Sequence, residues 1–169
     1  MKKILFVILI FSNLVFAQNI DFEGFMNFSY SNNSGKIHLE VNNLDKEFLY
    51  INSLSRGIGN NDLGLDRGQL GNTRIVFFTK RGNKILMVQP NTRYVSNSDN
   101  YLENKAVEEA FARSVLFSFE IIEEKNNNYI IDLTPLLMND AHGVAQRLKY
   151  SNSGNYSLNK SMSAIELDR

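Results

Sequence analysis

Five glycines fall within the stretch Gly57-Ile58-Gly59-Asn60-Asn61-Asp62-Leu63-Gly64-Leu65-Asp66-Arg67-Gly68-Gln69-Leu70-Gly71. It lies between residues 47–54 and residues 74–79, two segments whose β-branched and aromatic residues predict strands. Glycine adopts positive φ and lets another backbone approach closely, but ordering it costs more conformational entropy than ordering other residues. So many glycines between two strands therefore predict a connecting loop of defined shape.

The glycine spacing does not match the loops that bind phosphate, dinucleotides or calcium. A phosphate loop needs a lysine and a hydroxyl residue after its last glycine, whereas Leu65 and Asp66 follow Gly64. Asp62 stands where a dinucleotide fingerprint would need its third glycine. Residues 62–66 also lack the alternating acidic ligands of an EF-hand. On the residues alone, a shaped connector is favoured over a ligand site.

The rest of the chain predicts a sheet built largely from hairpins. Apolar and polar residues alternate through residues 37–41 and 115–121, with the period of two that is typical of half-buried strands. A Gly-Asn pair at 82–83 separates two β-rich runs, and the asparagines at 126–128 separate two more, as in hairpins. The continuous apolar run at residues 48–51 instead indicates a strand in the middle of the sheet.

Two helices complete the predicted fold. One begins at the capping residue Asn100, with Glu103 three positions later. The other begins at Thr134 and carries an apolar stripe that includes Val144 and Leu148. We therefore expect an α+β fold: a largely antiparallel, meandering β-sheet of about six to eight strands, with two α-helices packed on one face.

Residues 1–17 have the three parts of a signal peptide. Two lysines precede an apolar run at residues 4–11, and small or branched residues precede Gln18. The run is shorter than the ~20 residues that span a membrane, and no cysteine is present to carry a lipid. We expect cleavage between Ala17 and Gln18, a single domain at residues 18–169, no stable membrane span after cleavage, and a secreted, periplasmic or cell-envelope location.

The charge and the absence of cysteine exclude several classes of protein. The chain has 18 basic and 18 acidic residues, and losing Lys2 and Lys3 with the leader leaves 16 basic residues against 18 acidic ones. Such a balance does not favour binding to nucleic acid or to an anionic membrane surface. Because there is no cysteine, an exported domain of this sequence must be held together by packing without disulfides.

The histidines do not form a catalytic motif. Hydrolysis of peptides at zinc requires two histidines one helical turn apart, a glutamate that acts as general base, and a third ligand. This chain has only His38 and His142, neither of them in an HExxH segment, and it has no Gly-x-Ser-x-Gly motif. We therefore expect no catalytic residue, no metal site and no cofactor bound by this chain.

Several short motifs follow one another in the part of the chain that begins at about Phe25. They are Glu47-Phe48-Leu49-Tyr50, Leu54-Ser55-Arg56-Gly57-Ile58-Gly59, the rest of the glycine-rich stretch from Asn61 to Gly71, Val88-Gln89-Pro90-Asn91, Ala106-Val107-Glu108-Glu109-Ala110-Phe111-Ala112 and Asp140-Ala141-His142-Gly143-Val144-Ala145. Together they resemble a domain of unknown function that precedes the catalytic domain in secreted bacterial zinc-dependent metalloproteases of the met-zincin type. Composition and periodicity alone indicate only an exported, β-rich domain, and the link to proteolysis comes from the resemblance.

The resemblance implies an accessory or pro-domain that supports folding, docking or regulation of the catalytic domain, in cis or in trans. The chain would then be truncated before that catalytic domain, and zinc would be bound only there. The candidate docking residues are Asp62, Asp66, Arg67, Gln69 and His142. Asp66 or His142 could also reach the zinc and hold a proenzyme inactive, although a capped histidine in the first turn of a helix is the simpler interpretation.

The alternative is a stand-alone secreted binding module, or a truncated paralogue, without enzymatic activity. It would recognise protein or glycan with the loop at residues 57–71. An HExxH segment in the reading frame that follows residue 169 would favour the accessory domain over this alternative.

Overall fold

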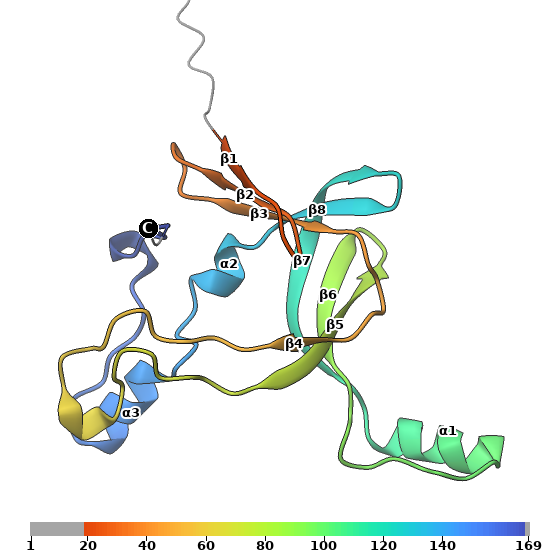
Figure 1. The fold of residues 1–169 in the computed structure, drawn as a ribbon. Coiled ribbons are helices and arrows are strands. Elements are labelled where there is room, and N and C mark those ends of the chain that lie inside the picture. The colour runs from red at the N-terminus through yellow and green to blue at the C-terminus, as the bar shows by residue number, and fades with distance from the viewer. Residues whose placement is uncertain (1–18, 168–169) are drawn as a thin grey trace, which may run out of the picture.

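The computed structural model describes residues 19–167 of the 169-residue chain (Figure 1). The cleavage site expected between Ala17 and Gln18 lies outside the described residues. Within them, no helix is both long enough and apolar enough to cross a membrane.

Residues 19–167 contain one curled sheet of eight strands, in the order β1-β2-β3-β8-β7-β6-β5-β4 (Figure 1). Every neighbouring pair is antiparallel, as the sequence predicts. The strands are β1 (Asn19–Phe22), β2 (Phe28–Ser31), β3 (Ile37–Val41), β4 (Phe48–Tyr50), β5 (Arg74–Arg81), β6 (Lys84–Gln89), β7 (Ser114–Lys125) and β8 (Asn128–Asp132). The pairing of β3 with β8 joins the N-terminal meander to the rest of the sheet.

The predicted second helix is two separate helices. The three α-helices of residues 19–167 are α1 (Tyr101–Ala110), α2 (Thr134–Leu137) and α3 (Val144–Tyr150), and single 3-10 turns form at η1 (Asn61–Leu63) and η2 (Lys160–Met162). The break between α2 and α3 ends at Gly143, which has φ 64° and ψ 36°. This left-handed conformation cannot continue a right-handed helix, and glycine adopts it without the penalty that a Cβ would add.

The structure does not show two helices packed on one face of the sheet. In Figure 1, α1 stands clear of the sheet at the end of two extended segments, and none of its residues is buried. The ring of Phe111, just after α1, stacks on Tyr94 with 4.1 Å between the ring centroids. The apolar side of α1 therefore meets the segment before it instead of the sheet. The fold is mixed α+β and consists mostly of sheet.

The core lies on the concave face of the curled sheet. Its buried members are Leu39, Val41, Val76, Phe78, Ile85, Met87, Phe119, Tyr129 and Ile131. They alternate along their strands, so they share one face of the sheet. The cluster joins residues of β3 to residues of β5, although three other strands separate these two in the sheet. Such contacts form where the sheet curls around its own side chains.

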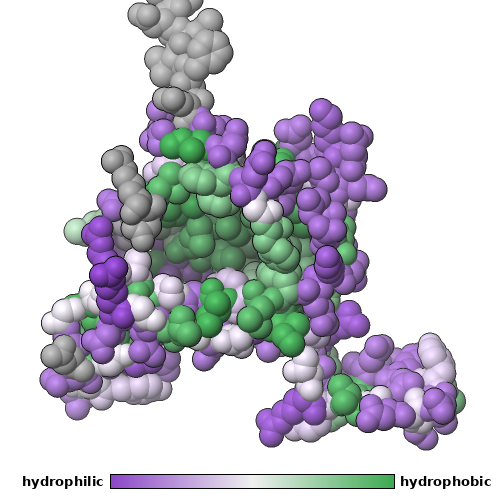
Figure 2. All heavy atoms as spheres, in the orientation of Figure 1, coloured by the Kyte–Doolittle hydropathy of each residue, from purple (hydrophilic) through white to green (hydrophobic). Residues whose placement is uncertain are grey.

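This concave face is only partly covered. Figure 2 shows a hydrophobic hollow between the region of β1–β3 and the region of β4. The half-buried apolar side chains that pack against the core are Met26, Phe28, Leu44, Phe48, Tyr50, Leu116, Phe117, Ile121, Leu133 and Leu136. The sheet thus exposes apolar surface on its inner side.

The prediction of a central strand at residues 48–51 is wrong. Among the strands of residues 19–167, β4 lies at one end of the order and pairs only with β5. The strand with four consecutive buried residues, Val76 to Thr79, is β5 instead. Leu49 is 65% exposed, because no element among residues 19–167 covers the outer face of β4. A continuous apolar run indicates that both faces are suited to burial, but tertiary pairing decides whether they are buried.

Candidate functional site

The glycine-rich loop is an extension of the β4–β5 hairpin. Ser53 pairs with Leu70 in an antiparallel bridge. Leu54 donates its N–H to the carbonyl of Gln69 at 3.0 Å, and its own carbonyl accepts from Gly68 N at 2.7 Å. These backbone hydrogen bonds hold the two limbs of the loop together, so the predicted defined shape is present in the structure.

The tip of the loop is anchored to α3. Leu63 and Leu65 are buried, at 6% and 1% exposure. Arg147, from α3, donates from Nη1 to the carbonyl of Leu63 at 3.0 Å. Gly64 and Gly68 have φ of 60° and 83°, where side chains with a Cβ are strained. The backbone conformation of a structural connector therefore explains why glycine is found at positions 64 and 68.

The four loop residues predicted to take part in docking are all exposed. They are Asp62, Asp66, Arg67 and Gln69. Among residues 19–167, no salt bridge includes Asp62, Asp66 or Arg67. The loop therefore presents these side chains to solvent and does not gather them into a catalytic cluster.

His142 lies beside α3 at the edge of a cavity of about 360 Å³. The cavity is lined by Leu54, Asn139, Asp140, Ala141, His142, Val144, Ala145, Leu148, Tyr156, Ser157 and Leu158. Asp140 caps the helix, because its two carboxylate oxygens accept from Val144 N at 2.8 Å and Ala145 N at 2.9 Å. Nε2 of His142 is buried and has no hydrogen-bond partner within the described part of the chain. Such an unpaired group costs about 1–3 kcal/mol.

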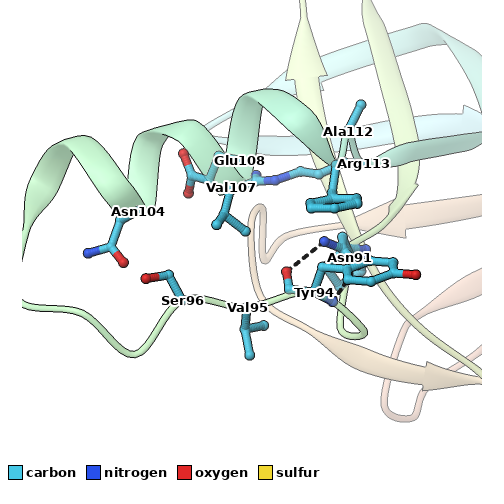
Figure 3. Close-up of a pocket in the computed structure, with 11 residues that line it drawn as sticks. Asn91, Tyr94, Val95, Ser96, Asn104, Val107, Glu108, Ala112 and Arg113 are labelled. Atoms are coloured by element: carbon cyan, nitrogen blue, oxygen red, sulfur yellow. Dashed lines mark hydrogen bonds between the residues drawn. The ribbon is translucent and has the colours of Figure 1, made fainter.

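A larger cleft, of about 740 Å³, separates α1 from the segment before it (Figure 3). Asn91 closes one end: its Nδ2 donates to the carbonyl of Tyr94 at 2.8 Å, and its Oδ1 accepts from Tyr94 N at 3.2 Å. Figure 3 shows Asn104 and Val107 pointing from α1 toward the segment that carries Ser96. The cleft is open and combines apolar and polar walls.

This cleft was not predicted from the sequence, although a signal was present. Two of the motifs that carry the resemblance, Val88–Asn91 and Ala106–Ala112, both contribute residues to its lining. The cleft also contains Glu108 and Arg113, side chains of opposite charge. The guanidinium of Arg113 lies 5.7 Å from the ring centroid of Phe77, so a cation–π contact holds it at the junction of α1 and the sheet.

Asp132 and Lys80, whose pKa values are shifted, each form an ion pair at the sheet. Burial acts to raise the pKa of Asp132, but hydrogen bonds from Thr134 and Lys36 outweigh it and hold this pKa below its ordinary value. The hydrogen bond to Glu124 raises the pKa of Lys80. Neither residue lines the cavity at His142 or the cleft at α1. Within residues 19–167, no group of three or more histidine, cysteine, aspartate or glutamate side chains is arranged to hold a metal ion.

Comparison with curated proteins and with solved structures finds no match. The family comparison does find one, and the description of that family contains no reference to proteolysis. Residues 68–168, more than half of the chain, match the family described as Domain of unknown function (DUF5117), and the chain therefore belongs to this family.

Proposed function

We propose that this chain is a non-catalytic domain that docks onto the catalytic domain of a secreted zinc-dependent metalloprotease. The observation that supports docking is the uncovered apolar hollow on the concave face of the sheet (Figure 2). A soluble domain that exposes a large contiguous apolar patch commonly uses it as an interaction surface. The identity of the partner rests on the resemblance of the motifs between Glu47 and Ala145.

In this proposal the two domains have different roles. The partner supplies the zinc, its ligands and the general base, and this domain supplies a surface that supports folding, docking or regulation. The partner would also cover α1, none of whose residues is buried. Asp62, Asp66, Arg67, Gln69 and His142 stay candidates for contacts around the apolar surface.

The test is a binding measurement between separate chains. Residues 18–169 and a zinc metalloprotease catalytic domain encoded beside them would be expressed separately and titrated by calorimetry. We expect dissociation constants of tens of micromolar or lower, about −6 kcal/mol or better. Absence of binding at these concentrations would contradict the proposal.

A chelator arm separates two modes of docking. If the apolar surface carries the interaction, removing zinc from the catalytic domain leaves the affinity within about twofold, because a chelator does not change buried apolar area. If Asp66 or His142 ligates that zinc, binding is lost with the metal. Asp66→Asn and His142→Gln would then reproduce the loss in the presence of zinc.

The second candidate function is a stand-alone binding module. The cleft at α1 supports it, because about 740 Å³ is within the size range of ligand sites. This candidate predicts saturable binding of a peptide or glycan by residues 18–169 alone, with shifts of amide resonances in the cleft or in the glycine-rich loop.

A further inference from the structure

Within residues 19–167, the outer edge of the sheet at β4 is unpaired. Phe48, Leu49 and Tyr50 form the strand, and within residues 19–167 they pair with β5 on one side and with no strand on the other. Natural edge strands commonly carry a proline or a charged residue that discourages pairing with another chain. β4 has neither, so its free side can accept a further strand.

The side chains of β4 are apolar on both faces. Phe48 faces the core, with its ring centroid 5.4 Å from that of Phe78. Tyr50 packs on the same core and is half-buried. Leu49 points to the opposite face, where it pairs with Ile75, and the two are 65% and 41% exposed. A strand added beside β4 would cover apolar groups on both faces of the sheet.

The free edge also borders the hydrophobic hollow. Figures 1 and 2, drawn in the same orientation, place the hollow between β4 and the N-terminal meander. Because the sheet curls, a strand added to β4 would continue the curl toward the hollow. We propose that an extended strand of a partner polypeptide pairs with β4 and covers this hollow. The inference rests on the proposed function for the identity of that partner.

The chemistry of the edge favours a strand over other occupants. A helix satisfies its own backbone groups, so it cannot pair with the N–H and C=O groups that β4 leaves free. A second copy of the chain would pair one three-residue strand with another. Such a contact is far smaller than the ~800 Å² per partner of a stable interface. An extended segment of a larger polypeptide can pair with the edge and also cover the hollow.

The first experiment needs no knowledge of the partner. Residues 18–169 would be used to select binders from a phage-displayed library of random nonapeptides, and the most enriched peptide would be synthesised with a twin N-methylated at alternate residues. We expect saturable amide shifts at residues 48–51. The twin should bind about tenfold more weakly or worse, because N-methylation removes the donors that pair with a strand edge.

Two variants of similar exposure locate the interaction. Leu49→Lys places a charge on the edge strand, whereas Val115→Lys places one on β7, which lies inside the sheet; the wild-type side chains are 65% and 58% exposed. Both variants should melt within a few degrees of the wild type. We expect Leu49→Lys to weaken peptide binding at least tenfold and Val115→Lys to leave it unchanged.

Several results would overturn the inference. They are failure to enrich any peptide, equal binding of the N-methylated twin, shifts that map away from β4, and a concentration-dependent dimer that Leu49→Lys abolishes, since the occupant would then be a second copy. If the catalytic domain binds the wild type and binds the Leu49→Lys variant equally well, this result would also overturn the inference. If the catalytic domain fails to bind while the peptide binds at β4, the proposed function fails and the strand site stands.

Discussion

At the scale of single residues, the glycines of the loop differ in what they do. Gly68 has φ 83° and open space where a Cβ would lie, so a side chain there meets only backbone strain. Gly71 has no positive φ, but a Cβ on it would collide with the side chain of Asn52. The sequence shows that glycine is needed in this loop, but it does not distinguish a turn from a close approach.

We expect Gly68→Val to destabilise the domain by about 1–3 kcal/mol, because a β-branched residue avoids positive φ. Gly68→Asn should cost less, since asparagine tolerates the left-handed region better. The free energy of unfolding would be measured by denaturant titration. Gly24→Val is the matched control, because Gly24 has no positive φ and a Cβ there would lie 4.0 Å from the carbonyl oxygen of Met26. Equal stability of Gly68→Val and the wild type would contradict the assignment.

Asp132 makes stability depend on pH in the acid range. Its carboxylate accepts from Thr134 N at 3.0 Å and pairs with Lys36 at 3.1 Å. The pKa in the folded protein is below the ordinary value of 3.8. A lowered pKa stabilises the folded state above the unfolded-state pKa, and this contribution is lost as the pH falls through the folded-state pKa.

We therefore expect Asp132→Asn to flatten the loss of stability on acidification below about pH 4. Urea melts at several pH values between 2.5 and 7 would measure this. Asp45→Asn is a suitable control, because Asp45 has no salt bridge in the part of the chain that the structure describes. Parallel pH profiles of Asp132→Asn and the wild type would exclude this role.

At the scale of elements, local chemistry predicts well where α1 begins and where the two hairpins turn. Asn100 accepts from Leu102 N at 2.9 Å and begins α1 as the sequence indicates. Gly82 and the pair Asn126 and Asn127 adopt positive φ in the two predicted hairpins. The apolar stripe continues through Gly143 and does not report the φ of one residue, so it gives no signal of the break there.

Capping of α3 by Asp140 gives a prediction for one element. We expect Asp140→Ala to destabilise α3 by about 1 kcal/mol, because two backbone donors lose their acceptor. Hydrogen exchange would rise at residues 144–150, and cleavage of the loop at residues 57–66 by a protease would accelerate because Arg147 tethers that loop. Asp99→Ala is the control, since Asp99 is exposed in the loop before α1. Unchanged exchange at residues 144–150 would exclude the capping role.

At the scale of the whole molecule, the class of fold could be predicted and its arrangement could not. Alternation and turn residues indicate an antiparallel sheet because both act over a few residues. The order of strands depends on pairing between distant segments, so the edge position of β4 and the detached position of α1 had no local signal. The same limit applies to the hollow, which exists only once distant segments meet, whereas the cleft at α1 is lined by residues between 90 and 113.

The pairing of β3 with β8 has a consequence for how the chain acquires its structure. His38 lies opposite Asp132 and Val41 opposite Tyr129, so the two strands meet only after a long intervening segment has been made. Closing such a large loop slows folding, because its entropy is lost before the contacts that compensate for it are gained. The meander of β1, β2 and β3 therefore has no further sheet to join until β8 pairs with β3.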